Sequence, residues 1–289
     1  MMRASPERTG RNMWTGIGLP LFLSAMIFAL GVVPATAAPK AEPWPFWAAN
    51  DPGSRTSVDH VPWDRFLKKY VVTNNPSGIN RVQYASVTPE DRKALDAYVR
   101  RLQQAAVTRL NRDEQKSYWI NLYNALTVKV VLDHYPVKSI RDINISPGIF
   151  SRGPWGAKLV TIQGEKVSLN DIEHRILRPL WKDNRVHYAV NCASLGCPNL
   201  QPKAYTRENT ETLLEKGARE YVNHPRGARL EGDRLFLSSI YDWFRPDFGG
   251  SEESVVRHLR KYAEPGFAEK LKGFKGKISY DYDWRINKP

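Results

Sequence analysis

Residues 111–136 read NRDEQKSYWINLYNALTVKVVLDHYP. Asn111 with Glu114 three positions later is typical of a helix start, and Pro136 predicts that the helix stops near Tyr135. Apolar residues lie on nearly every side of this helix, a pattern typical of a helix that is buried on all faces. We therefore expect a central buried helix over about residues 112–135, with the rest of the domain packed around it.

The apolar surface of this helix is interrupted on one face by two amide side chains, those of Asn121 and Asn124. Buried amides must form hydrogen bonds, so one interpretation is that they brace a neighbouring loop. The other is that they line a pocket and polarise a substrate carbonyl, as oxyanion-type donors. Trp119, on the apolar stripe of the same helix, is a further candidate for substrate binding.

The segments around this helix alternate between helical patterns and hairpins. Hairpins are predicted to turn at Gln163-Gly164 and at Gly232-Asp233, and residues 277–283 are predicted to form a final strand. Residues 185–191 alternate in character and are also predicted to form a strand. Because no β-α-β rhythm occurs, we expect an α+β fold with a largely antiparallel sheet.

The first 37 residues have the features of an export signal. A basic start is followed by the uncharged apolar run Thr15–Val33, and Ala35-Thr36-Ala37 fits a cleavage site. The alternative is an uncleaved membrane anchor. We predict a signal peptide over residues 1–37, an extended lead-in over 38–57 and one domain over 58–289. The mature chain is predicted to be periplasmic or secreted, without a transmembrane span.

The chain is strongly basic, with a formal net charge of +13. Removing three Arg and one Glu with residues 1–37 lowers this charge to +11. In an exported protein this positive charge would favour binding to an anionic envelope surface, made of either phospholipid headgroups or acidic polymers. Nucleic acid is not expected as a partner, because the basic residues are scattered and form no known nucleic-acid-binding pattern.

Both cysteines of the chain lie in residues 185–198, RVHYAVNCASLGCP. A cysteine nucleophile needs a base beside its sulfur and a third group that orients the base. Cys192 is the candidate nucleophile, His187 the base and Glu173 the orienting group. The other interpretation of Glu173 is helix capping opposite Asn170. Strict alternation along a strand would place His187 and Cys192 on opposite faces, so this dyad requires the chain to turn after Asn191.

Two further polar residues belong to the same candidate site. His174 is an alternative base, although a lone histidine on a helix is more often a surface or core residue. Asn191 is a candidate for substrate binding.

Other roles for the two cysteines stay open. In an oxidising compartment Cys192 and Cys197 are expected to pair if their geometry allows it, as a structural or regulatory bridge. A thiol-recognition site of another kind is a further alternative. A metal site made from both cysteines, His187 and His174 is the weakest, because this cysteine spacing is not typical of zinc sites. We predict no metal and no cofactor.

At this point the chain resembles the DUF547 domain family. The resemblance covers about residues 58–285 and rests on the order of these motifs: YWINLYNAL (118–126), LNDIEHRILR (169–178), HYAVNC (187–192), GCP (196–198), YDWF (241–244) and YDW (282–284). It implies a bacterial envelope or secreted protein of unsettled function, with kinship to papain-like or transglutaminase-like cysteine enzymes. Papain-like enzymes place the nucleophile before the histidine, whereas here His187 precedes Cys192.

Together these features predict an exported cysteine-dependent hydrolase or transferase. Its substrate would carry an amide or thioester bond in a small peptide, a thiol compound or an envelope component. The alternative is a non-catalytic envelope-binding protein in which Cys192 and Cys197 are bridged. A redox-gated enzyme, inactive when bridged, is a third interpretation.

Overall fold

In the computed structural model, which describes residues 39–148 and 151–289, helix α3 spans Arg112–His134. Asn111 caps it by accepting the backbone N–H of Glu114 at 2.9 Å. Most of its side chains are buried, including Trp119, which packs edge-on against Trp47 with 4.9 Å between the ring centroids. Helix α3 therefore contributes to the larger of the two hydrophobic clusters among the described residues.

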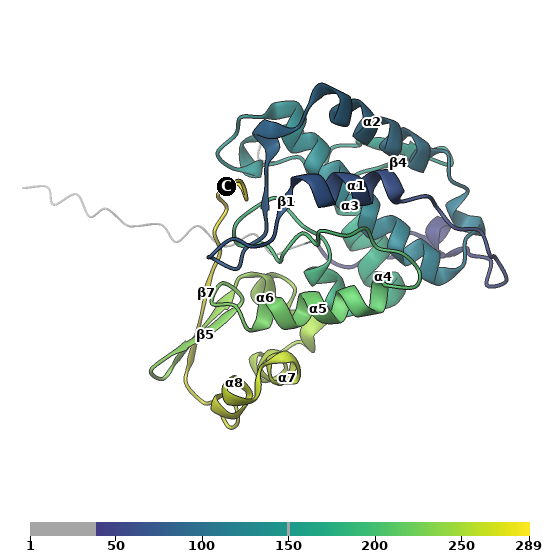
Figure 1. The fold of residues 1–289 in the computed structure, drawn as a ribbon. Coiled ribbons are helices and arrows are strands. Elements are labelled where there is room, and N and C mark those ends of the chain that lie inside the picture. The colour runs from purple at the N-terminus through teal and green to yellow at the C-terminus, as the bar shows by residue number, and fades with distance from the viewer. Residues whose placement is uncertain (1–38, 149–150) are drawn as a thin grey trace, which may run out of the picture. The chain divides into compact units, whose positions relative to one another are not determined.

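The other elements before residue 182 surround α3. Helix α1 packs on α2, and α2 packs on α3, as their teal and blue ribbons show in Figure 1. The helices and strands of this part are α1 (Val61–Tyr70), β1 (Val71–Val72), β2 (Arg81–Val82), α2 (Pro89–Gln103), β3 (Val160–Ile162), β4 (Glu165–Val167) and α4 (Arg178–Trp181). Short 3-10 helices span Pro45–Ala48, Tyr84–Ser86, Val107–Arg109 and Ile140–Asp142.

Most elements after residue 182 contribute to the second hydrophobic cluster, around Tyr188, Tyr221 and Tyr241, although Leu213 and Leu214 belong to the first. These elements comprise α5 (Thr210–Val222), β5 (Ala228–Glu231), β6 (Arg234–Ser238), α6 (Ile240–Trp243), α7 (Glu252–Tyr262), α8 (Pro265–Lys270) and β7 (Lys277–Asp281). Helix α7 packs against both α5 and α8, in the green and yellow part of Figure 1. A 3-10 helix, η7 (Arg245–Phe248), follows α6.

The fold is α+β, as expected, but the strands form three small sheets. Strands β1 and β2 pair antiparallel, and so do β3 and β4. In the third sheet β5 and β6 are antiparallel, whereas β6 and β7 are parallel. The hairpins predicted at Gln163-Gly164 and Gly232-Asp233 are confirmed, and so is a final strand. The short strands are covered by helices, and β6 and β7 can run parallel because α6, η7, α7 and α8 lie between them in sequence.

The strand predicted over residues 185–191 is wrong. Residues Asn184–Tyr188 form a 3-10 helix, η6. Asp183 starts it, because its carboxylate accepts the backbone N–H of Arg185 at 3.0 Å. An alternating pattern over only seven residues is a weak strand signal. The Asp183 cap therefore outweighs it, and the segment forms a helical turn instead of a strand.

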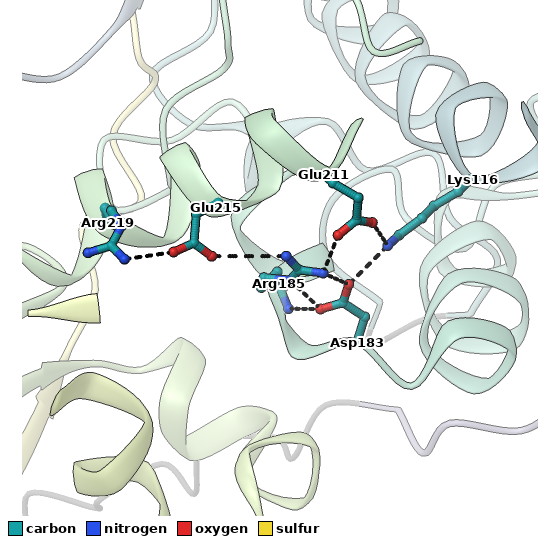
Figure 2. A network of polar contacts seen from close by, with 6 residues as sticks. All are labelled: Lys116, Asp183, Arg185, Glu211, Glu215 and Arg219. Atoms are coloured by element: carbon teal, nitrogen blue, oxygen red, sulfur yellow. Dashed lines mark hydrogen bonds and ion pairs between the residues drawn. The ribbon is translucent and has the colours of Figure 1, made fainter. Parts of the chain in front are cut away.

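A network of ion pairs holds η6 in place (Figure 2). Lys116 of α3, whose side chain is only 7% exposed, lies 2.9 Å from Asp183 and 3.0 Å from Glu211 of α5. Arg185 contacts the same two carboxylates, at 2.7 and 2.6 Å. At the outer end of the network, Arg219 pairs with Glu215 at 2.8 Å. The network ties α3, η6 and α5 together.

The helix predicted after Asn170 also differs in its start and its type. Asn170 makes no capping hydrogen bond. Ser168 and Asp171 cap each other instead: the Ser168 hydroxyl accepts the Asp171 N–H, and the Asp171 carboxylate accepts the Ser168 N–H. The wider π-helix η5 (Asp171–Leu177) follows, and it continues into α4. Such wide turns are frequent at functional sites.

Candidate functional site

The cysteine loop, residues 191–198, is held by a segment far along the chain. Three backbone hydrogen bonds of 2.8 to 3.0 Å join residues 193–196 to residues 283–287. Gly196 approaches this segment so closely that a Cβ would lie 2.8 Å from the Asp283 nitrogen. Ala193, between the two cysteines, has a φ of 57°, in the left-handed region that non-glycine residues rarely adopt. The loop is therefore tightly constrained.

Cys192 and Cys197 form a disulfide, so both cysteines of the chain are bridged. This is the pairing that the sequence left open as an alternative to a free catalytic thiol. The two residues differ in exposure: Cys192 is half-buried, whereas Cys197 is only 3% exposed. Cys192 is thus the more accessible half of the bridge.

Hydroxyl and amide groups surround this disulfide. The Tyr282 hydroxyl lies 3.1 Å from the Cys192 Sγ and 3.3 Å from the Cys197 Sγ. The Ser194 hydroxyl lies 3.3 Å from the Cys192 Sγ, and the Cys192 backbone N–H donates to the Cys197 Sγ at 2.8 Å. Burial raises the pKa of Tyr282 well above its ordinary value, so this hydroxyl keeps its proton and can act as a donor.

His187 lies in a buried group of charged side chains. Its Nε2 is 2.7 Å from the Asp247 Oδ2, and its Nδ1 is 3.6 Å from the Glu173 Oε1. The ring stacks on Phe244, with 4.1 Å between centroids. Burial by itself lowers the pKa of His187, but the hydrogen bond to Asp247 and the charge of Glu173 raise it above the ordinary value. The ring is therefore favoured as an imidazolium between two carboxylates.

The two carboxylates are stabilised in their charged form. Burial opposes the ionisation of Glu173, but the positive charges of His174, His187 and Arg178 outweigh it and hold the pKa at about 2. Burial likewise opposes the ionisation of Asp247, and hydrogen bonds from His187 and Arg178 lower its pKa well below the ordinary range. The Tyr123 hydroxyl of α3 also donates to Glu173, at 3.1 Å.

Arg178 links this group to the start of the described chain. Its guanidinium contacts Asp247 through two hydrogen bonds, of 2.6 and 3.1 Å. Its Nη1 donates to the Pro39 carbonyl at 2.7 Å and lies 3.1 Å from the His174 Nδ1. Because arginine is only a donor, His174 must accept at Nδ1. Burial lowers the pKa of His174, so the ring is neutral near pH 7 and gains the charge that acts on Glu173 only in more acidic solution.

The predicted substrate-binding amides have backbone partners. Asn121 bonds both the carbonyl and the N–H of Tyr205, at 2.7 and 3.0 Å. Asn124 bonds the Ala189 carbonyl and the Asn191 N–H, at 2.9 and 2.8 Å. The Asn191 side chain in turn bonds the Pro198 carbonyl and the Ala193 N–H, at 2.7 and 2.8 Å. These contacts favour the interpretation that the amides brace neighbouring loops. Trp119 is fully buried in the core.

The structure brings together part of the predicted catalytic set. Glu173 does lie beside His187, rather than capping a helix opposite Asn170. Between the His187 ring and either sulfur, no hydrogen bond is found within residues 39–148 and 151–289. The predicted dyad of Cys192 with His187 is therefore not assembled in this bridged state, because η6 directs the ring toward Asp247.

Three residues of the site were not predicted from the sequence: Asp247, Arg178 and Tyr282. Asp247 lies in the short acidic and aromatic stretch IYDWFRPDFGG (240–250), and Tyr282 lies in a YDW motif. Both motifs were visible in the sequence. Their partners were not, because His187 and Asp247 are 60 residues apart and Cys192 and Tyr282 are 90 residues apart.

A groove of about 1020 Å³ opens beside the cysteine loop. Tyr282 lines it and also contacts both sulfurs, so the disulfide lies next to the groove. The groove is lined by Lys138, Ser139, Asp142, Pro225, Arg226, Arg229, Asp281, Tyr282, Asp283, Trp284 and Arg285.

Two of the basic residues of the groove have no carboxylate partner. Arg229 is paired with Glu231 and Asp281, and Arg285 with Asp283. Lys138 and Arg226 form no ion pair within the part of the chain that the structure describes. The buried Arg226 Nε also lacks a hydrogen-bond partner. The exposed Lys138 is available to an anionic ligand, whereas both Nη atoms of Arg226 already donate to the Leu195 carbonyl and the Asn199 side chain.

Searches of the described residues for a metal site and for a membrane span give negative results. No group of three or more His, Cys, Asp or Glu side chains in residues 39–148 and 151–289 is arranged to hold a metal ion. No helix in those residues is long and apolar enough to cross a bilayer.

Comparison with known proteins gives one match. The model of the family described as "Protein of unknown function, DUF547" matches residues 107–222. Residues 107–222 are therefore similar to the DUF547 family. The match is shorter than the predicted resemblance over 58–285, and it includes Glu173, His187 and both cysteines. No curated protein and no solved structure matches the chain.

Proposed function

We propose that this protein is an exported binding protein for an anionic component of the cell envelope. The observation that carries the proposal is the groove in which two cations without carboxylate partners, Lys138 and Arg226, lie beside an aromatic group. The bridged state of the cysteines also favours binding over catalysis by a free thiol nucleophile. Export rests on the predicted signal peptide of residues 1–37, which lies outside the described residues.

The aromatic group of the groove is rigid. Trp284 stacks on Trp243 at 5.5 Å and contacts Tyr282 at 4.7 Å and Trp155 at 5.7 Å, measured between ring centroids. Arg141 lies over the Trp284 ring, 5.2 Å from its centroid. These half-buried rings offer apolar contact area, and the nearby cations add charge complementarity. An acidic polysaccharide has the matching features, since its sugar rings have apolar faces and its carboxylates are negative.

The test is a binding measurement with polygalacturonate as an acidic polysaccharide and dextran as a neutral one. We expect binding to polygalacturonate that weakens with added salt, and none to dextran. Lys138→Gln should weaken binding about 5- to 10-fold, which corresponds to about 1 kcal/mol for one lost ion pair. Lys275→Gln is the matched control, because Lys275 is exposed and lies outside the groove.

Equal binding of dextran, or unchanged binding by Lys138→Gln, would contradict the proposal. Phosphatidylglycerol vesicles serve as the competing anionic surface. Tighter binding to the vesicles than to polygalacturonate would also count against a saccharide ligand.

A second candidate is the cysteine-dependent hydrolase or transferase, with its kinship to papain-like enzymes. Its support is that Glu173 lies 3.6 Å from His187, as an orienting group would. It requires the bridge to be reduced and His187 to turn from Asp247 toward Cys192. Hydrolysis of a model thioester by the reduced protein, and its loss in Cys192→Ala, would favour this function. Equal rates for the reduced, oxidised and mutant proteins would exclude it.

A further inference from the structure

We propose that the Cys192–Cys197 bridge is a redox-active disulfide that oxidises dithiols, with Cys192 as the sulfur attacked and Cys197 as the leaving group. The proposal goes beyond ligand binding and does not depend on it. Three observations carry it: the unequal exposure of the two sulfurs, the donors around them, and their position beside an open groove.

The exposure determines which sulfur an incoming thiolate can reach. Cys192 is half-buried and contacts Tyr282, which lines the groove, whereas Cys197 is 3% exposed. Attack on a disulfide requires access along the sulfur–sulfur axis, so the exposed sulfur reacts first. A dithiol arriving through the groove therefore meets Cys192.

A backbone donor favours Cys197 as the leaving group. When the bond breaks, the Cys197 sulfur takes the electron pair and becomes a thiolate. The Cys192 N–H is directed at that sulfur at 2.8 Å, and the Tyr282 hydroxyl, which contacts both sulfurs, lies 3.3 Å from it. Donors that stabilise a thiolate lower the pKa of its thiol, and a leaving thiol of lower pKa departs faster.

The exchange balances without any other reactant. One substrate thiolate attacks the Cys192 Sγ, which forms a mixed disulfide and releases the Cys197 thiolate. The second substrate thiolate then attacks its own sulfur in the mixed disulfide and releases the Cys192 thiolate, which the hydroxyls of Ser194 and Tyr282 contact. The substrate leaves as a disulfide, and the protein takes up its two electrons and two protons as two thiols.

The first test measures how fast dithiothreitol reduces the oxidised full-length protein, with samples quenched by acid and alkylated for mass spectrometry. Tyr282→Phe removes the hydroxyl donor but keeps the ring. We expect it to slow reduction about 3- to 10-fold, because the lost bond acts on a thiolate that is only partly formed in the transition state. Tyr280→Phe is the matched control, since its hydroxyl contacts Glu252 and no sulfur. Equal rates for Tyr282→Phe and the wild type would overturn the proposal.

The second test identifies the attacked sulfur without relying on Tyr282. Each single-cysteine variant, Cys197→Ala and Cys192→Ala, is treated with glutathione disulfide, and the mixed disulfide is measured by mass. We expect Cys192 in the first variant to react at least about tenfold faster than Cys197 in the second, given their difference in access. Equal or reversed rates would refute the assignment. Neither test involves Lys138, so failure here is distinguishable from failure of the polysaccharide assay.

Discussion

Replacing Asp247 by Asn tests the charged group around His187. Asp247 is the only carboxylate within hydrogen-bond distance of Arg178 or His187 among the described residues, and these two side chains are 4% and 1% exposed. Removing one partner of a buried ion pair typically costs about 3–5 kcal/mol. Asp247 itself is 20% exposed, and asparagine keeps one oxygen acceptor, so we expect a loss near the lower limit, about 3 kcal/mol.

The loss should depend on pH in a defined direction. His187 has a raised pKa in the folded state, so its contribution to stability is fully present below its ordinary pKa of about 6.5 and disappears as the pH rises through the raised value. Asp247 has a lowered pKa, so its contribution is present above about pH 4 and disappears in more acidic solution. The difference between the wild type and Asp247→Asn should therefore be largest between about pH 4 and 6.5.

The assay is urea unfolding followed by tryptophan fluorescence, from pH 4 to pH 9. Asp242→Asn is the control, because Asp242 pairs with Arg245 in the same segment but is 34% exposed, so its loss should stay within about 1 kcal/mol. A cost below about 1 kcal/mol for Asp247→Asn at pH 6, or an equal cost at pH 6 and pH 9, would refute the reasoning.

Three further predictions concern other buried polar groups. Lys116→Met should cost about 1–3 kcal/mol in urea unfolding, because Lys116 is buried between two carboxylates, whereas the half-exposed Lys129→Met should cost less than about 1 kcal/mol. Asn121→Ala should cost about 2 kcal/mol by the same measurement, since it leaves the buried backbone of Tyr205 unpaired; a neutral effect would contradict its bracing role. Because Glu173 has a pKa of about 2, wild-type stability should fall as the pH drops below about 4.5, and Glu173→Gln should flatten this slope in acid titrations followed by circular dichroism. An unchanged slope would show that Glu173 does not contribute to it.

The parts of the fold that local sequence determines could be predicted. The Asn111 cap, the apolar pattern after it and the hairpin turn at Gly232-Asp233 all depend on residues a few positions apart. All the residues that produce each of these signals lie within one short segment, so the sequence of that segment is enough to predict the structure. The helix start and both hairpins were accordingly found where the residues indicated.

The site was harder to predict, because its contacts join distant segments. Alternation over residues 185–191 fitted a strand, but the Asp183 cap and the ion pair of Lys116, 67 residues from Asp183, favour a helical turn. This turn directs His187 to Asp247 instead of Cys192. The parallel pairing of β6 with β7 was equally hidden, because no local pattern encodes it.

The pairing of the cysteine loop with residues 283–287 also sets an order of events during synthesis. Cys192 is made 90 residues before Tyr282, the side chain that contacts both sulfurs. At ~5–20 residues per second, that interval lasts roughly 5–20 s. Throughout it the two thiols are present without the hydroxyl and the backbone partners that later fix their loop. The loop therefore reaches its final geometry only after the segment that follows β7 has been made and has docked.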